Sequence, residues 1–341
     1  MKVYIQIIAI ISVLTIFNSC QKYNQIDNTR TIKTPYTLLI GSYDGAMYKT
    51  NDALYFNTFL HVDQTAIRQI LVADTNILYV KRNIYYSKDD GKSFKDSYTD
   101  VTPYLDLFYE YYIPNPAAYD KNTRKVYVCG KTGVQVSDDL GASFTTDGNW
   151  SPSAPASFDK MRSITQLDNG KLYLMGSMSD QYIKDGNGPW TQVPQTGSAL
   201  PTDTTVWYVE HSHDTLFAID FYGKSGVYYS ADEGQNWSKC SGLPAKNEIL
   251  FGNRPFGSEA FYVGLDSAGL YRLNGTSFVS TGAGIPWNAK INYVEGKRVV
   301  YRTDVMKYYL FCSTDKGLYI SESSDGQDWK ILKNGMFSTL N

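Results

Sequence analysis

The sequence predicts an all-β fold of seven similar units arranged in a ring, a seven-bladed β-propeller, and three observations lead to this prediction. The chain of 341 residues contains 29 Tyr, 15 Phe and 6 Trp, and aromatic side chains favour strands. A short Ser-x-Asp-x-Gly-x-x-Phe/Trp pattern recurs along the chain. The longer unit around this pattern returns every 38 to 51 residues, and short strands repeated at about 40 to 50 residues are typical of propeller blades.

The short pattern predicts a tight turn between two antiparallel strands. Its Gly tolerates a positive φ, and its Asp and Ser side chains can accept hydrogen bonds from the backbone amides of the turn. Its aromatic ring can then pack beneath the turn. The turn residues are therefore predicted to be structural: Ser87, Asp89, Gly91 and Phe94; Ser137, Asp139, Gly141 and Phe144; Ser230, Asp232, Gly234 and Trp237; and, one residue shorter, Ser323, Asp325, Gly326 and Trp329.

These four copies resemble the Asp-box, also called the bacterial neuraminidase repeat. The resemblance covers about residues 36 to 341 and implies a propeller of the sialidase and sortilin-like superfamily. A calcium site is the alternative interpretation of the Asp-x-Gly spacing, but too few ligands recur in each copy to favour it. We therefore expect no metal and no cofactor.

Weaker copies of the unit complete the ring. The seven copies end at Phe56, Phe94, Phe144, Trp190, Trp237, Phe278 and Trp329. They nearly exhaust the chain, so residues 36–341 are expected to form one propeller domain. The first copy lacks a clear inner strand, which either Phe337 to Leu340 or Arg30 to Lys33 would supply; the C-terminal segment is favoured.

The N-terminus predicts export. Residues 1–19 have a positive start and an interrupted apolar run that is too short to span a membrane comfortably, as in a signal peptide. Ser19-Cys20 resembles the lipobox of bacterial lipoproteins, in which the Cys is acylated, although Phe17 stands where Leu is usual. Residues 20–35 are expected to form a lipidated N-terminus and tether; the alternative is a Cys that happens to follow a plain signal peptide. The expected location is the bacterial cell envelope, anchored to a membrane on the periplasmic or surface face.

Charge and cysteine content exclude other classes of protein. Lys and Arg number 32 and Asp and Glu number 34, a net charge of −2, which does not favour a nucleic-acid partner. The remaining cysteines, Cys129, Cys240 and Cys312, are odd in number and lack zinc-site spacing. Buried thiols are expected.

The candidate ligand face carries the loops between blades and the Gly-bearing loops within them. Where Asp-box propellers have a known activity, the resemblance implies that this face binds the ligand. Aromatic platforms beside polar groups suit sugars, although each ring could instead pack a loop onto the ring of blades. The candidates are Tyr43, Arg82, Tyr112, Trp150, Tyr222, Lys224 and Trp287.

No catalytic residues can be named from the sequence. The resemblance to sialidases implies three Arg, a Tyr nucleophile paired with a Glu, and an Arg-Ile-Pro motif, which is absent here. An acid pair could be assembled from Glu110, Asp220 or Asp266, but no spacing selects them. Glu210 to Asp214, with two His, is interpreted as a polar hairpin turn rather than a metal site. We therefore expect a binding or scaffold protein that recognises a glycan or an envelope protein; the alternative is a sialidase-like glycoside hydrolase with an atypical active site.

Overall fold

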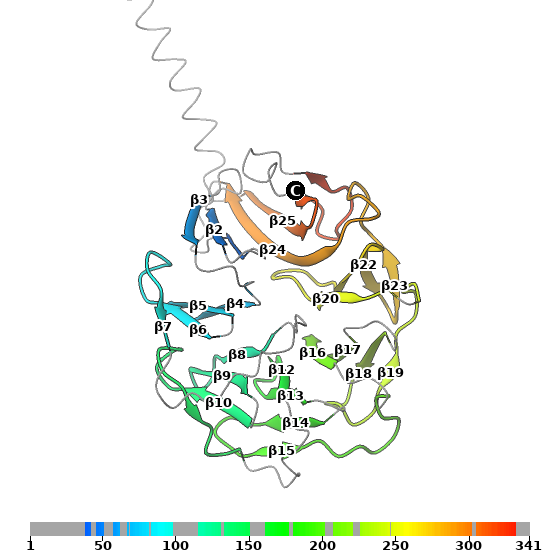
Figure 1. The fold of residues 1–341 in the computed structure, drawn as a ribbon. Coiled ribbons are helices and arrows are strands. Elements are labelled where there is room, and N and C mark those ends of the chain that lie inside the picture. The colour runs from blue at the N-terminus through cyan, green and yellow to red at the C-terminus, as the bar shows by residue number, and fades with distance from the viewer. Residues whose placement is uncertain are drawn as a thin grey trace, which may run out of the picture.

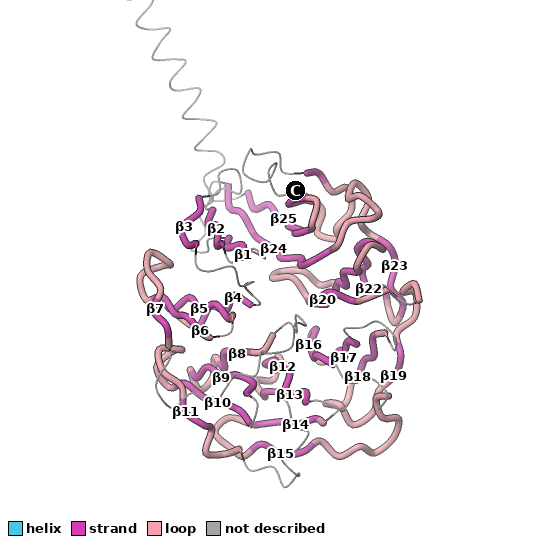
Figure 2. The backbone as a smooth tube through the Cα atoms, in the orientation of Figure 1, coloured by secondary structure: helices cyan, strands magenta, loops and turns pink. Residues whose placement is uncertain are grey.

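The chain folds into short strands that form seven antiparallel sheets around a common centre, a β-propeller (Figures 1 and 2). A computed structural model describes residues 38–41, 46–50, 57–61, 67, 69–81, 83–97, 115–130, 133–150, 161–176, 180–201, 207–220, 226–245, 247–301 and 305–331. Within these ranges every regular element is a strand. Accordingly, the described residues contain no helix long and apolar enough to cross a membrane.

Six of the sheets have four strands, which run in sequence order from the inside of the ring to its rim. The first four comprise β4 (Gln69–Ala73), β5 (Asn76–Val80), β6 (Ile84–Ser87), β7 (Lys95–Asp96); β8 (Ala117–Asp120), β9 (Lys125–Gly130), β10 (Gly133–Ser137), β11 (Thr145–Thr146); β12 (Met161–Gln166), β13 (Leu172–Gly176), β14 (Gln181–Lys184), β15 (Trp190–Gln192); and β16 (Trp207–Ser212), β17 (Thr215–Asp220), β18 (Val227–Ser230), β19 (Ser238–Lys239). The last two comprise β20 (Ile249–Asn253), β21 (Tyr262–Leu265), β22 (Gly269–Asn274), β23 (Ser277–Ser280); and β24 (Ile291–Tyr301), β25 (Val305–Thr314), β26 (Gly317–Ser321), β27 (Lys330–Ile331).

The seventh sheet corrects the predicted number of blades. It contains β1 (Leu38–Gly41), β2 (Ala46–Thr50) and β3 (Asn57–His61) and lies between the β4–β7 and β24–β27 sheets (Figure 1). The structure thus has six complete blades rather than seven. Among the described residues, no fourth strand pairs with the inner side of β1, where the other six sheets have one. Both segments predicted to supply the missing strand lie outside the described residues.

The repeated turns are held by the hydrogen bonds that their residue types allow. The Ser230 hydroxyl accepts from the Gly234 amide at 2.9 Å and donates to Asp232 at 2.7 Å. The Asp232 carboxylate in turn accepts from the Asn236 amide at 2.9 Å. The same contacts recur in the turns that begin at Ser87 and Ser137. Each turn therefore closes on its own Ser and Asp side chains.

All three of these carboxylates, Asp232 included, have a pKa below the ordinary value for this reason. Burial alone would raise the pKa of Asp139, but hydrogen bonds from Ser137 and Ser143 outweigh burial and lower it. The more exposed Asp89 shows the same direction, chiefly because the Ser93 hydroxyl and amide donate to it. These hydrogen bonds stabilise the charged form of Asp89 and Asp139.

The fourth turn is offset from the predicted alignment. The Ser that ends the preceding strand and is buried, as Ser87, Ser137 and Ser230 are, is Ser321 rather than Ser323. The Ser321 hydroxyl accepts from the Ser323 amide at 3.2 Å, so Ser323 stands where the other turns have Asp. Ser323 in turn donates to Asp325. The extra residue within this turn displaced the sequence alignment by two positions.

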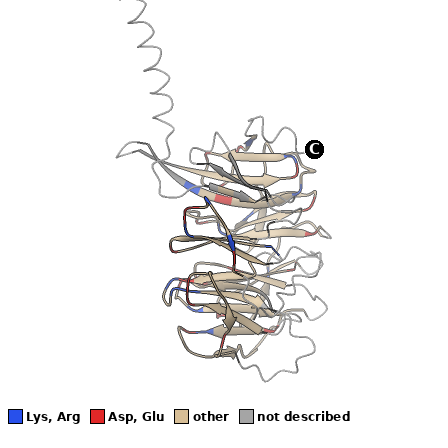
Figure 3. Ribbon diagram, turned by 60° about the vertical axis from the view of Figure 1, so that its left-hand side comes forward, with Lys and Arg blue, Asp and Glu red and all other residues tan. Residues whose placement is uncertain are grey.

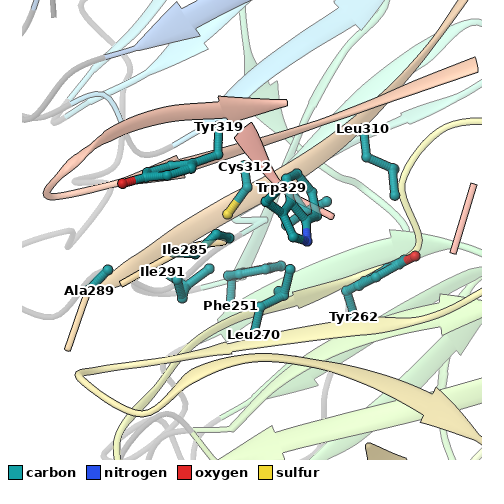
Figure 4. Packing of buried hydrophobic residues seen from close by; sticks show 11 residues of the cluster. Phe251, Tyr262, Leu270, Ile285, Ala289, Ile291, Leu310, Cys312, Tyr319 and Trp329 are labelled. Atoms are coloured by element: carbon teal, nitrogen blue, oxygen red, sulfur yellow. The ribbon is translucent and has the colours of Figure 1, made fainter. Parts of the chain in front are cut away.

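The core lies between neighbouring sheets. In the largest of its clusters, Trp329 of the last sheet packs against Phe251, Tyr262 and Leu270 of the sheet before it (Figure 4). Phe144, Trp190, Trp237 and Phe278, the predicted aromatic residues of four other units, are likewise buried. The prediction of buried thiols is confirmed for Cys129, Cys240 and Cys312. The apolar repeats therefore stabilise contacts between blades as well as within them.

Polar side chains tie the inner strands of successive blades together. Gln69 both donates to and accepts from the backbone of Ala117, at 2.8 and 2.9 Å. Ser163 does the same with Val209, at 3.1 Å in both directions. Asn253 donates to the Val294 carbonyl at 2.8 Å. These bonds satisfy backbone groups on the open edges of the inner strands, which would otherwise stay unpaired.

Strand order divides the loops between two faces. The turns between first and second strands and the Ser-Asp-Gly turns lie on one face, here named the turn face. The connections between blades and the loops between second and third strands lie on the other, here named the loop-rich face. On the turn face, the eleven-residue β24 and ten-residue β25 form a hairpin longer than any other in the described residues. It reaches beyond the neighbouring sheets, and acidic and basic residues are interspersed in this view (Figure 3).

Candidate functional site

One large ring stands exposed on the described part of the loop-rich face. Trp287, in the connection from β23 to β24, has 81% of its surface exposed. The residues on either side of it in the same connection, Ile285 and Ala289, are buried. The connection is therefore fixed to the core at two points, and its Trp ring is presented to solvent between them.

Charged groups that follow Trp287 link this connection to the neighbouring loops. Lys290 forms an ion pair with Asp266 at 3.0 Å, and its amide donates to the Asp315 carboxylate at 2.8 Å. Asp315 in turn pairs with Lys316 at 3.1 Å. Hydrogen bonding to Asp266 raises the pKa of Lys290, which stays charged. This arrangement holds three loops of two adjacent blades in a fixed geometry beside an exposed aromatic ring.

The other predicted ligand-face residues have different outcomes. Trp150 packs edge-on against the rings of Tyr182 and Trp190, with centroids 5.1 and 6.1 Å away, and is only partly exposed. Its ring packs against the buried cluster of the two neighbouring blades at the edge of the core. The remaining candidates lie outside the described residues: Tyr43, Arg82, Tyr112, Tyr222 and Lys224.

A second polar group, which the sequence did not indicate, lies at the inner strands. Glu210 of β16 and Glu295 of β24 are partly buried and act on each other electrostatically. Glu210 accepts a hydrogen bond from the Asn115 side chain. Glu295 accepts from the amides of Phe256 and Gly296, both at 2.8 Å. Among the described residues, no Lys or Arg forms an ion pair with either carboxylate.

Burial without a cation shifts the protonation of both acids. Desolvation raises the pKa of Glu210 to about 8, and the nearby Glu295 carboxylate adds to the rise. Desolvation likewise raises the pKa of Glu295, against the opposing effect of its two amide hydrogen bonds. Glu210 therefore carries a proton at neutral pH, because desolvation and the neighbouring carboxylate both disfavour its charged form.

Two tyrosines belong to the same group. Tyr208 precedes Glu210 by two positions on β16, and Tyr293 precedes Glu295 by two on β24, so alternation places each pair on one side of its strand. Burial raises the pKa of both phenols, and the Glu210 carboxylate contributes to each rise. The Phe251 ring lies 5.6 Å from that of Tyr293 and closes the space between β20 and β24. We name Tyr208, Glu210, Asn253, Tyr293 and Glu295 the axial group.

Glu210 was not a candidate from the sequence because residues 210–214 were predicted to form a turn. The predicted polar turn from Glu210 to Asp214 was wrong in its first half: Glu210, His211 and Ser212 continue β16 and pair with β17. Only His213 and Asp214 turn the chain, and His213 has a positive φ of 54°. These polar residues continue the strand because their backbone groups form hydrogen bonds with β17. The hydrophobic pattern of the sequence does not reveal such pairing.

The two histidines of this segment have separate partners. The His211 ring lies 2.9 Å from the Thr165 hydroxyl and 3.3 Å from Asp168, and burial lowers its pKa. The His213 ring meets Glu259 at 2.9 Å in an exposed contact. In the described part of the chain, no three His, Cys, Asp or Glu side chains gather in a way that could hold a metal ion.

Solved structures show which fold the chain shares. No protein family and no curated protein matches its sequence. The structure of YCF48 bound to D1 peptide is similar over 86% of this chain and 91% of that one, with a TM-score of 0.53 at 13% identity. YCF48 from Cyanidioschyzon merolae covers 80% and 87%, with a TM-score of 0.52 at 14% identity. PorZ, an essential bacterial surface component of the type-IX secretion system of Porphyromonas gingivalis, covers 89% of this chain and 38% of its own, with a TM-score of 0.55 at 13% identity. At such identities the likeness establishes the β-propeller fold.

Proposed function

We propose that this protein is an exported, lipid-anchored propeller that binds a protein or glycan of the bacterial cell envelope on its loop-rich face. The observation that carries the proposal is Trp287, an 81% exposed ring on a connection fixed to the core at both sides. Large exposed aromatic residues on rigid supports are the usual anchors of binding surfaces. The ion pairs around Lys290 supply the polar rim that such an anchor needs.

A peptide or protein is the partner that we favour over a glycan. A propeller of similar fold, YCF48, was solved with a bound peptide, and PorZ is a surface component of a secretion system. These are properties of those proteins, and they support the proposal by showing what the fold can carry. A single flat aromatic ring with charged neighbours suits a peptide chain, which offers both apolar and polar groups.

The proposal is tested by substitution of Trp287. We expect Trp287→Ala to weaken capture of the partner by about 30-fold or more, the loss of roughly 2 kcal/mol that a buried aromatic anchor contributes. Capture would be scored by cross-linking in intact cells and, for glycans, by retention on a glycan array. The matched control is Phe256→Ala, a ring 61% exposed in the turn after β20, on the opposite face. Equal loss in both variants, or no loss in Trp287→Ala, would contradict the proposal.

Lipid anchoring through Cys20 has its own test. If Cys20 is acylated, Cys20→Ala should move nearly all of the protein from the membrane fraction to the soluble fraction, because the variant lacks the thiol that carries the acyl chain. Fractionation followed by immunoblotting measures the change, and Cys129→Ala, which removes a buried thiol, is the control. A Cys20→Ala protein that remains with the membrane would refute the lipid anchor.

Glycoside hydrolysis remains the second candidate because of one observation, the electrostatic interaction between Glu295 and Glu210. A protonated carboxyl beside a second carboxyl is the pairing that glycosidases use for proton transfer and attack. The same glycan array, analysed for cleavage products, tests this candidate. Products that disappear in Glu210→Gln would establish hydrolysis, whereas retention of glycans without cleavage would exclude it.

A further inference from the structure

The axial group contains two carboxylates that protein contacts alone do not neutralise. Glu295 accepts hydrogen bonds from two backbone amides, and Glu210 accepts from the Asn115 side chain, with the His211 amide and the Thr165 hydroxyl also beside it. These contacts are hydrogen bonds to neutral groups. Burying two interacting carboxyl groups without a cation costs free energy, which protonation of one of them only partly recovers.

Two buried polar atoms beside these carboxylates also have no hydrogen-bond partner. Tyr208 has no exposed surface and Asn253 only 4%, yet the Tyr208 hydroxyl and the Asn253 side-chain oxygen are unpartnered. Asn253 is held by its amide to the Val294 carbonyl, between Tyr293 and Glu295 in sequence, so its oxygen belongs to the same group. Buried polar atoms are nearly always paired, and these two are both able to accept a hydrogen bond.

We propose that the axial group binds a cationic nitrogen group, an ammonium or guanidinium such as a Lys or Arg side chain of a bound peptide carries. Each of its open positions can accept a hydrogen bond: the two carboxylates once Glu210 has released its proton, an amide oxygen and a phenol oxygen. The ring of Tyr293 adds a face that attracts such a cation. Tyr293 is 38% exposed and both glutamates are partly exposed, which gives the group contact with solvent.

Organic cations fit these residues better than a metal ion or a neutral ligand does. The described residues offer two carboxylates here, below the three His, Cys, Asp or Glu side chains of a recognisable metal site. An N–H donor cation satisfies the charge of the glutamates and the unpaired acceptors together. A neutral ligand would leave the charge uncompensated. The inference does not depend on Trp287 or on the loop-rich face.

Binding of a cation is expected to change the protonation of Glu210, which can be measured. The titratable groups that interact electrostatically with Glu210 are Glu295 and Tyr293 on β24 and Tyr208 on its own strand, while His211 contacts Thr165 and Asp168 of the adjacent blade. The buried Lys297 follows Glu295 by two positions on β24, and within the described residues it forms no ion pair with either glutamate. A bound cation favours the charged form of Glu210 and so must release its proton below about pH 8. Affinity for the cation is therefore expected to rise between pH 6 and pH 8.

The experiment uses the full-length protein in detergent and two peptides, acetyl-Gly-Arg-Gly-amide and its citrulline analogue, which has the same shape without the charge. Calorimetric titration at pH 7 in two buffers of different ionisation enthalpy measures both affinity and proton release. We expect the Arg peptide to bind at least tenfold more tightly than the citrulline peptide, with release of part of a proton. The double variant Glu210→Gln/Glu295→Gln should reduce that preference to about one. The exposed pair Glu248→Gln/Glu259→Gln should leave it unchanged.

Equal binding of the two peptides, or no binding of either up to about 10 mM, would overturn the proposal. So would a charge preference that survives the double variant. If the double variant does not fold, the proton release in the unmodified protein and the single variant Glu295→Gln decide the question. Because the Trp287→Ala variant retains the axial group, a charge preference in that variant separates this site from the loop-rich face.

Discussion

Gly234→Ala is expected to lower the free energy of unfolding by about 3 kcal/mol. Gly234 has a φ of +87°, which side chains rarely adopt. An added Cβ would also lie 2.1 Å from the Tyr173 hydroxyl, which is itself hydrogen-bonded to Gln181. Backbone strain and steric overlap therefore act together, and Tyr173 is fully buried, so a shift of its ring would disturb the packing around it.

The control for this prediction is Gly275→Ala in the turn between β22 and β23. Gly275 has a φ of +62°, but no atom lies within 4 Å of the position of its Cβ. Strain alone should cost about 1 kcal/mol there. Urea unfolding followed by tyrosine and tryptophan fluorescence compares the two variants. If both lose the same stability, the close packing of the Ser-Asp-Gly turn against the neighbouring blade does not contribute as proposed.

Glu210→Gln is expected to make stability less dependent on pH and to stabilise the protein in alkaline solution. The folded-state pKa of Glu210 is raised from 4.5 to about 8, so the folded protein holds a proton that the unfolded chain has lost between these values. Stability must therefore fall as pH rises through this window. The Gln side chain stays neutral and can still accept the hydrogen bond from Asn115. This removes roughly 2 to 4 kcal/mol of the pH-dependent loss.

The difference in stability between Glu210→Gln and the unmodified protein is the measured quantity. It should be near zero at pH 5 and favour the variant by roughly 2 kcal/mol or more at pH 9 in urea unfolding. Glu248→Gln, at an exposed carboxylate in the connection before β20, is the control and should show no such trend. A difference that stays constant from pH 5 to pH 9 would show that Glu210 is not desolvated at the axis.

Local patterns in the sequence predicted the turns better than the site. Ser, Asp and Gly at fixed spacing determine a turn because their hydrogen bonds lie within eight residues, and three of the four copies form the bonds that these residue types allow. The fourth failed because one inserted residue transferred the role of Ser323 to Ser321. The predicted number of blades was wrong because the first copy contributes only three strands among the described residues. A fourth strand would have to come from outside the repeated segment.

The site residues depended on contacts that sequence spacing does not reveal. Trp150 and Trp287 look alike in sequence, both in aromatic connections between blades. Only the position of neighbouring rings decided that Trp150 packs on Tyr182 and Trp190 while Trp287 faces solvent. Glu210 and Glu295 lie 85 positions apart, and no local pattern connects them.

By itself the sequence determined the all-β class, the repeated turns, the buried thiols and the propeller ring, because these follow from composition, short-range hydrogen bonding and a regular period. The tertiary structure decided which blade is incomplete, which tryptophan is exposed and which acids meet at the axis. These three outcomes depend on how blades that are distant in sequence approach one another. Closure of the ring brings the inner strands together whatever residues lie between them in the sequence. The burial that raises the pKa of Glu210 therefore arises only when β16 and β24 share the axis.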